Sequence, residues 1–189
     1  EDEKYFIPGG SIVGCTTVNH RTLKKSFTLG TIICEDLWSK HNYELIDKTL
    51  GYSDILAVPN HSYFYYGKKK ERLRLVSNLA KEYNIPIAYV NPVGVGDIVK
   101  NVMIYDGGSF VVNNQGLLFA DGFCTELRQQ YKQIDISGNH AIVTAMQDNK
   151  YHLIYNALTY SMREFYRLSG LKKAQVHISG GLDSAVGAC

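Results

Sequence analysis

The sequence predicts an α/β fold: one layered α/β domain, a connection, and the beginning of a second α/β unit. Three observations support this prediction. Short apolar runs rich in β-branched residues alternate with segments of helical periodicity over residues 28–120. The alternation weakens between residues 122 and 149. A helical segment, another short run and a glycine-rich loop then follow in that order.

The first half of the chain is expected to contain three buried strands separated by two helices. The apolar runs that predict the strands are 28–33, 54–59 and 85–91. Apolar residues at helical spacing predict a helix from Tyr43 that ends at Gly51. A longer amphipathic helix is expected over residues 68–83, with a basic start and one apolar face.

The second half is expected to form three short strands, then a helix and a final strand. The three strands are predicted at 102–105, 109–113 and 117–120, and a turn at residues 114–116 joins the last two. Helical periodicity predicts a helix over residues 151–168, which Gly170 ends. Residues 174–178 predict a strand that leads directly into the glycine-rich loop.

Composition limits the classes of function. The 189 residues carry 20 Lys and Arg against 18 Asp and Glu, and the net charge of +2 argues against nucleic acid or an acidic membrane surface as a partner. No apolar run approaches the roughly 18–20 residues that a membrane helix needs, and the N-terminus does not resemble a signal peptide. The four cysteines form no CxxC pair, so neither a disulfide framework nor a zinc site is predicted. A reducing, cytoplasmic location is expected.

The first segment that could carry a catalytic residue is Gly30–Trp38, which reads GTIICEDLW. A cysteine at the end of a buried strand, on a sharp turn, suits a thiolate nucleophile beside backbone N–H groups that could form an oxyanion hole. Spacing alone favours the other interpretation of Cys34, a buried structural cysteine. Glu35 and Asp36 disfavour a thiolate, so a stabilising cation would have to come from another element.

The second such segment is the string SGGLDSA, which carries five candidate phosphate-binding residues. These are Ser179, Gly180, Gly181, Asp183 and Ser184. Two glycines after a strand let the backbone approach a polyanion, and serine hydroxyls and N–H groups can surround phosphate. The string is no Walker A loop, because it lacks Gly-Lys-Ser/Thr. A simple strand-to-helix turn with Asp183 or Ser184 as N-cap remains the alternative.

These strings resemble two known motifs. SGGLDSA resembles the pyrophosphate loop of the N-type ATP pyrophosphatases, and CEDLW resembles the nucleophile elbow of the nitrilase, or carbon–nitrogen hydrolase, superfamily. A chain that carries both motifs in this order resembles the family of glutamine-dependent NAD⁺ synthetases. Further strings agree with that family, and the resemblance covers almost the whole chain: residues 1–9, SYFYYGK at 62–68, YVN at 89–91, DGGS at 106–109, and the helix at 155–166.

The resemblance implies a fold and a division of the chain. Residues 1–124 would be the C-terminal part of a nitrilase-like α-β-β-α sandwich, the glutaminase domain. Residues 125–149 would be a linker, and residues 150–189 the first helix and βα unit of a Rossmann-like ATP pyrophosphatase domain. The chain starts without Met and ends five residues after Ser184, so we expect an internal fragment of a longer protein. The full-length protein is expected to be a homo-oligomer.

The resemblance also implies roles for individual residues. Cys34 would attack the side-chain amide of glutamine, and Ser62 and Lys68 would contact that substrate. The SGGLDS residues would hold ATP. Ammonia from glutamine would then amidate deamido-NAD⁺, while ATP gives AMP and pyrophosphate. Mg²⁺ is expected to accompany ATP, with its ligands outside this chain.

Two features of the resemblance limit these expectations. The catalytic Glu and Lys of the family lie upstream of the matched segment, so the isolated chain is expected to be inactive. Ser62 could instead be a solvated turn residue, and Lys68 a cation on a helix face. Three other functions remain open: a stand-alone nitrilase-type amidase with a non-catalytic tail, a non-catalytic module, and another amidotransferase with a pyrophosphatase loop.

Overall fold

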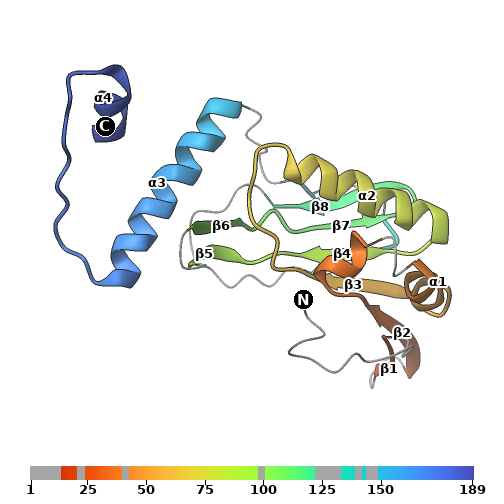
Figure 1. Ribbon diagram of the computed structural model, residues 1–189. Helices are drawn as coiled ribbons and strands as arrows, with labels where there is room; N and C mark the ends of the chain where they lie inside the picture. Colours follow the sequence, from red (N-terminus) through yellow and green to blue (C-terminus); the bar gives the residue numbers. More distant parts are fainter. Residues whose placement is uncertain are drawn as a thin grey trace.

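The computed structural model describes residues 14–20, 24–39, 43–97, 101–121, 133–138, 142–143 and 149–189. The string at residues 1–9, Cys124 and most of the predicted linker lie outside these residues. A central sheet with helices packed on it dominates the described part of the chain (Figure 1). No described helix is both long and apolar enough to cross a membrane.

Seven of the described strands form one mixed sheet in the order β1-β2-β3-β4-β7-β8-β9. Their bounds are β1 (Cys15–His20), β2 (Lys25–Thr31), β3 (Ile55–Pro59), β4 (Ile87–Val90), β7 (Phe110–Asn113), β8 (Gly116–Ala120) and β9 (Ile142–Val143). Strands β2, β3 and β4 are parallel, as expected for strands joined through helices. β1 pairs antiparallel with β2, and β7 pairs antiparallel with β4 and β8. The α/β prediction is confirmed.

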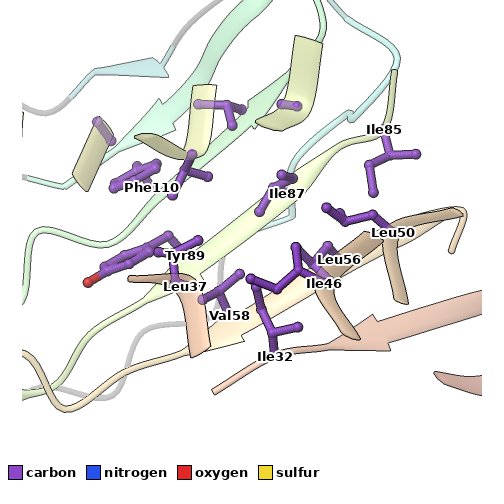
Figure 2. Packing of buried hydrophobic residues seen from close by; sticks show 14 residues of the cluster. Ile32, Leu37, Ile46, Leu50, Leu56, Val58, Ile85, Ile87, Tyr89 and Phe110 are labelled. Atoms are coloured by element: carbon purple, nitrogen blue, oxygen red, sulfur yellow. The ribbon is translucent and has the colours of Figure 1, made fainter. Parts of the chain in front are cut away.

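Two helices link the parallel strands. α1 (Tyr43–Gly51) lies between β2 and β3 in the chain, and α2 (Lys68–Tyr83) lies between β3 and β4. Their apolar side chains pack with those of the sheet in one core, shown in part in Figure 2. The buried cluster includes Ile46, Leu50, Leu56, Val58, Val76, Ala80, Ile87, Tyr89, Phe110 and Val112. This core holds the parallel strands in place. Residues that follow the ends of β2, β3 and β4 contribute to the candidate site.

A hairpin and a long helix follow the central core. β5 (Val93–Asp97) and β6 (Val102–Asp106) pair antiparallel in a separate two-stranded sheet. α3 (Lys150–Ser169) packs against this hairpin. The Asn149 side chain caps α3 by accepting hydrogen bonds from the amides of Tyr151 and His152, and Gly170 ends it with a φ of 68°. The expected helix and its glycine stop are therefore confirmed.

The strand predicted at residues 174–178 is not formed. Residues 171–179 are exposed and lie outside any helix or strand, and α4 (Leu182–Ala188) follows them (Figure 1). A strand is defined by a hydrogen-bonded neighbour, and no strand in the described residues pairs with this segment. Residues 142–143, within the predicted linker, instead form β9 and pair with β8.

Core packing predicts a measurable difference between two leucines. Leu56 of β3 is fully buried, whereas Leu158 of α3 is 61% exposed. Truncating a buried leucine removes apolar contacts and leaves a cavity, so Leu56→Ala should lower the free energy of unfolding by about 2–5 kcal/mol. Leu158→Ala makes the same chemical change and should cost far less. Denaturant unfolding of the purified chain measures both, and equal losses would contradict this description of the core.

Candidate active site

Cys34 sits on a strained turn directly after the β2 strand region. It is the first residue of the 3₁₀ helix η2 (Cys34–Leu37), and its φ of 41° lies in the left-handed region. Such a conformation costs a non-glycine residue about 1–3 kcal/mol. Buried Ile32 and Leu37 anchor the turn on both sides, and the Ile33 amide donates to the Asp36 carboxylate at 2.9 Å. This geometry presents the half-buried thiol at the end of the sheet, as expected for an elbow.

Ser62 lies in the loop that follows β3, and it is buried rather than solvated. Only 8% of the residue is exposed. Its amide donates to Asn91 Oδ1 at 2.9 Å, and its carbonyl accepts from Asn91 Nδ2 at 3.0 Å. The alternative of a solvated turn is therefore wrong, because side chains of other elements fix both backbone polar groups of Ser62.

A buried ion pair holds the same loop from the helix side. Arg72 of α2 is fully buried, and its Nη1 donates to Asp106 Oδ1 at 2.9 Å. Its Nη2 donates to the carbonyls of Ser62 at 2.9 Å and Tyr63 at 3.1 Å. Asn91 also donates to Asp106, at 3.4 Å, which closes the network. We call Arg72, Asn91 and Asp106 the Ser62 clamp.

The residues of this clamp were not singled out by the sequence analysis, although the sequence contains signals for them. Asn91 and Asp106 belong to the YVN and DGGS strings that carried the resemblance. Arg72 stands at four-residue spacing before Val76 and Ala80, which are the other buried residues of α2. That spacing places its side chain on the core face of the helix. An arginine on a core face requires a buried partner.

Tyr89 of β4 connects the clamp to the cysteine turn. It is fully buried and stacks on Phe110 with ring centroids 4.9 Å apart. Burial raises the pKa of Tyr89 to about 12, and the neighbouring Arg72 charge and Ser62 hydroxyl oppose that rise, whereas the Cys34 charge reinforces it. The Tyr89 ring centroid lies 6.0 Å from the Arg72 guanidinium carbon, and Tyr89 packs in the same core cluster as Ile32 and Leu37, which flank Cys34. Within the described residues its hydroxyl has no hydrogen-bond partner.

Lys68 stands at the first position of α2, against two aromatic rings. Its Nζ lies 4.0 Å from the ring centroid of Trp38 and 5.0 Å from that of Tyr65. Trp38 directly follows η2, so Lys68 contacts the turn that begins at Cys34. The lysine is half-buried and held by cation–π contacts rather than fully solvated on a helix face.

The SGGLDS loop forms a separate cluster. Gly180 has a φ of 87°, and the Ser184 hydroxyl donates to the Gly181 carbonyl at 2.9 Å and lies 3.2 Å from the Ser179 hydroxyl. Gly181 is the N-cap of α4, so the alternative in which Asp183 or Ser184 caps the helix is wrong. Lys68 contacts Trp38, which directly follows the Cys34 turn, and the clamp holds Ser62, so all three residues belong to the part of the chain that is built on the central sheet. No hydrogen bond or ion pair among the described residues joins them to this loop.

Comparisons with known proteins agree with the two motifs. No protein-family model matches the chain. Curated glutamine-dependent NAD(+) synthetases do match: that of Acinetobacter baylyi is 29% identical over 98% of this chain, and that of Synechocystis is 30% identical over 86%. The chain covers 32% and 30% of their respective lengths, so it spans about a third of these relatives.

Solved structures give the same result. The glutamine-dependent NAD⁺ synthetase of Acinetobacter baumannii, solved in complex with ADP, matches 98% of this chain with a TM-score of 0.71 and 25% identity, and the chain covers 33% of it. The synthetase of Cytophaga hutchinsonii matches 99% of this chain with a TM-score of 0.63, and the chain covers 30% of it. At 21% identity this match shows the shared fold alone. Over nearly its whole length the chain is therefore similar to the glutamine-dependent NAD⁺ synthetases, as CEDLW and SGGLDSA predicted.

Proposed function

We propose that the product of the gene encoding this chain makes NAD⁺ from deamido-NAD⁺ with glutamine as nitrogen donor. ATP is converted to AMP and pyrophosphate in this reaction. The observation that carries the proposal is the strained Cys34 turn, with Lys68 against the Trp38 that follows it, in a chain whose relatives are named glutamine-dependent NAD⁺ synthetases. A strained, anchored cysteine turn is a costly arrangement, and such strain concentrates at functional sites.

The proposed chemistry begins at the Cys34 thiolate. It attacks the side-chain amide carbon of glutamine and the carbon–sulfur bond forms; the carbon–nitrogen bond then breaks, and the departing nitrogen takes up the proton that the thiol gave up and leaves as ammonia. Water then cleaves the thioester and releases glutamate. Ser62 and Lys68 hold the substrate, through the serine hydroxyl and the charge of the ammonium group. The catalytic Glu and Lys of the family have no counterpart in this sequence, so these 189 residues supply the nucleophile and substrate contacts only.

The SGGLDS loop is proposed to hold ATP phosphates. Ser179 and Ser184 place two hydroxyls on one side of the loop, and added Cβ atoms at Gly180 would meet open space, so a ligand can approach the backbone there. Among the described residues no group of three or more His, Cys, Asp or Glu fits a metal ion. We therefore derive no step through Mg²⁺.

Replacing the nucleophile should separate the two nitrogen sources. Cys34→Ala in the full gene product should reduce glutamine-driven NAD⁺ formation by about 10⁴-fold or more, because the reaction loses its nucleophile. Ammonia-driven formation should survive, and Cys15→Ala should affect neither. NAD⁺ is measured with each nitrogen source. Absence of synthesis from both sources in the wild-type protein would reject the synthetase and favour the stand-alone amidase.

The two cysteines described near β1 and β2 should differ in reactivity. The Cys15 sulfur lies 3.6 Å from the Thr49 carbonyl and 3.5 Å from the Ser53 hydroxyl, so its thiol is engaged in hydrogen bonds. Cys34 should therefore react faster with iodoacetamide, and excess glutamine should protect it. Peptide mass spectrometry measures each site in the full gene product. Equal rates that glutamine does not change would favour the non-catalytic module.

ATP binding should depend on the conformation of Gly180. At 100-fold excess over its dissociation constant, ATP should stabilise the full gene product by about 2.7 kcal/mol, seen as a higher melting temperature. Gly180→Ala introduces a side chain at a φ of 87° and should abolish this shift. Gly187→Ala, in α4, is the matched control and should retain it. A shift that survives Gly180→Ala would argue against the loop as the nucleotide site.

A further inference from the structure

Arg72 is the only charged side chain among the largest fully buried ones in the described residues. Arginine is rarely fully buried unless its charge is paired. Here the Asp106 carboxylate balances the charge, and the carboxylate is itself almost fully buried. Neither side chain of the pair is exposed to solvent, so any role of the pair depends on the groups that it contacts inside the protein.

The guanidinium is aimed at the Ser62 loop. Nη2 has three acceptors within hydrogen-bond distance: the Ser62 carbonyl at 2.9 Å, the Ser62 hydroxyl at 3.1 Å and the Tyr63 carbonyl at 3.1 Å. Nη1 is used for Asp106. Because Nη2 carries two hydrogens, both are committed to this one loop. The planar fork of arginine suits such a set of acceptors better than the single point charge of lysine.

These contacts fix the direction in which the Ser62 hydroxyl can act. A guanidinium can only donate, so the serine oxygen accepts from Arg72 and its own hydrogen is left for another acceptor. Asn91 fixes the Ser62 amide and carbonyl, so the backbone cannot rotate to change this arrangement. With one lone pair used by Arg72, the Ser62 hydroxyl can still donate its hydrogen to one further acceptor, and the buried Tyr89 hydroxyl is a neighbour outside the clamp.

We infer that Arg72 is a positioning residue that makes Ser62 a hydrogen-bond donor to an acceptor oxygen of glutamine. The inference rests on the proposed function for its ligand, because glutamine offers a side-chain carbonyl and an α-carboxylate as acceptors. Arg72 itself lies beneath the loop and does not touch substrate. Its effect is on glutamine binding rather than on the chemistry at Cys34.

The test uses two arginines of the same helix in the full gene product. Arg72→Lys keeps the charge and loses the fork, and Arg74→Lys makes the same change on an exposed residue. For Arg72→Lys we expect the KM for glutamine to rise about tenfold, because that factor corresponds to the loss of one hydrogen bond to a charged group. The value of kcat should change less. Ammonia-driven synthesis should stay unchanged. Hydrogen exchange should increase at residues 60–67, while β3 and β4 stay protected. Arg74→Lys should change none of these values.

A second variant isolates the hydroxyl and serves if Arg72→Lys fails to fold. Ser62→Ala should raise the KM for glutamine to a similar extent while the loop keeps its wild-type exchange, because Arg72 still holds the two carbonyls. An unchanged KM in Ser62→Ala, or unchanged exchange in a folded Arg72→Lys, would overturn the inference. A wild-type protein that hydrolyses no glutamine would reject the proposed function and with it glutamine as the ligand, whereas the exchange result would still decide whether Arg72 positions the loop.

Discussion

The ion pair between Arg72 and Asp106 is the interaction on which the candidate site depends. Removing two charges from water is expensive, and further hydrogen bonds from Nη2 of Arg72 and to Asp106 offset part of that cost, while Arg72 Nε has no hydrogen-bond partner within the described residues. Those bonds go to Ser62, Tyr63 and Asn91. Loss of one partner of such a pair costs about 3–5 kcal/mol, since the other charge is left buried and unpaired. Stability of the core and the shape of the loop are thus linked.

The same core explains why the cysteine turn can be strained. Ile32 and Leu37 are both buried in the cluster that α1, α2 and the sheet enclose, and they flank Cys34. Their burial offsets the cost of a left-handed conformation at a residue with a Cβ. Tyr89 packs in the same core cluster as Ile32 and Leu37, and its ring lies 6.0 Å from the Arg72 guanidinium, so the two parts of the site share one support. The aromatic contact of Lys68 with Trp38 adds the third part.

Much of the fold could be predicted from periodicity. β2, β3, β4 and α2 occur where apolar runs and a strong amphipathic pattern indicated them. β1 was missed because CTTVNH is largely polar, and β5 because its VGVGD sequence is rich in glycine. The strand at 174–178 was wrong because a short run cannot reveal whether a partner strand lies beside it. In the candidate site, CEDLW singled out Cys34, but no quoted string contains Arg72, and its buried partner Asp106 lies far away in the sequence.

The central claim is that Cys34 is the nucleophile toward glutamine, and the most direct measurement traps its covalent intermediate. The full gene product is mixed with glutamine, quenched in acid within one turnover, and digested for mass spectrometry. We expect a glutamyl thioester on the peptide that contains Cys34 and none on the peptide that contains Cys15. A protein that hydrolyses glutamine without any adduct on Cys34, or with the adduct on another cysteine, would contradict it.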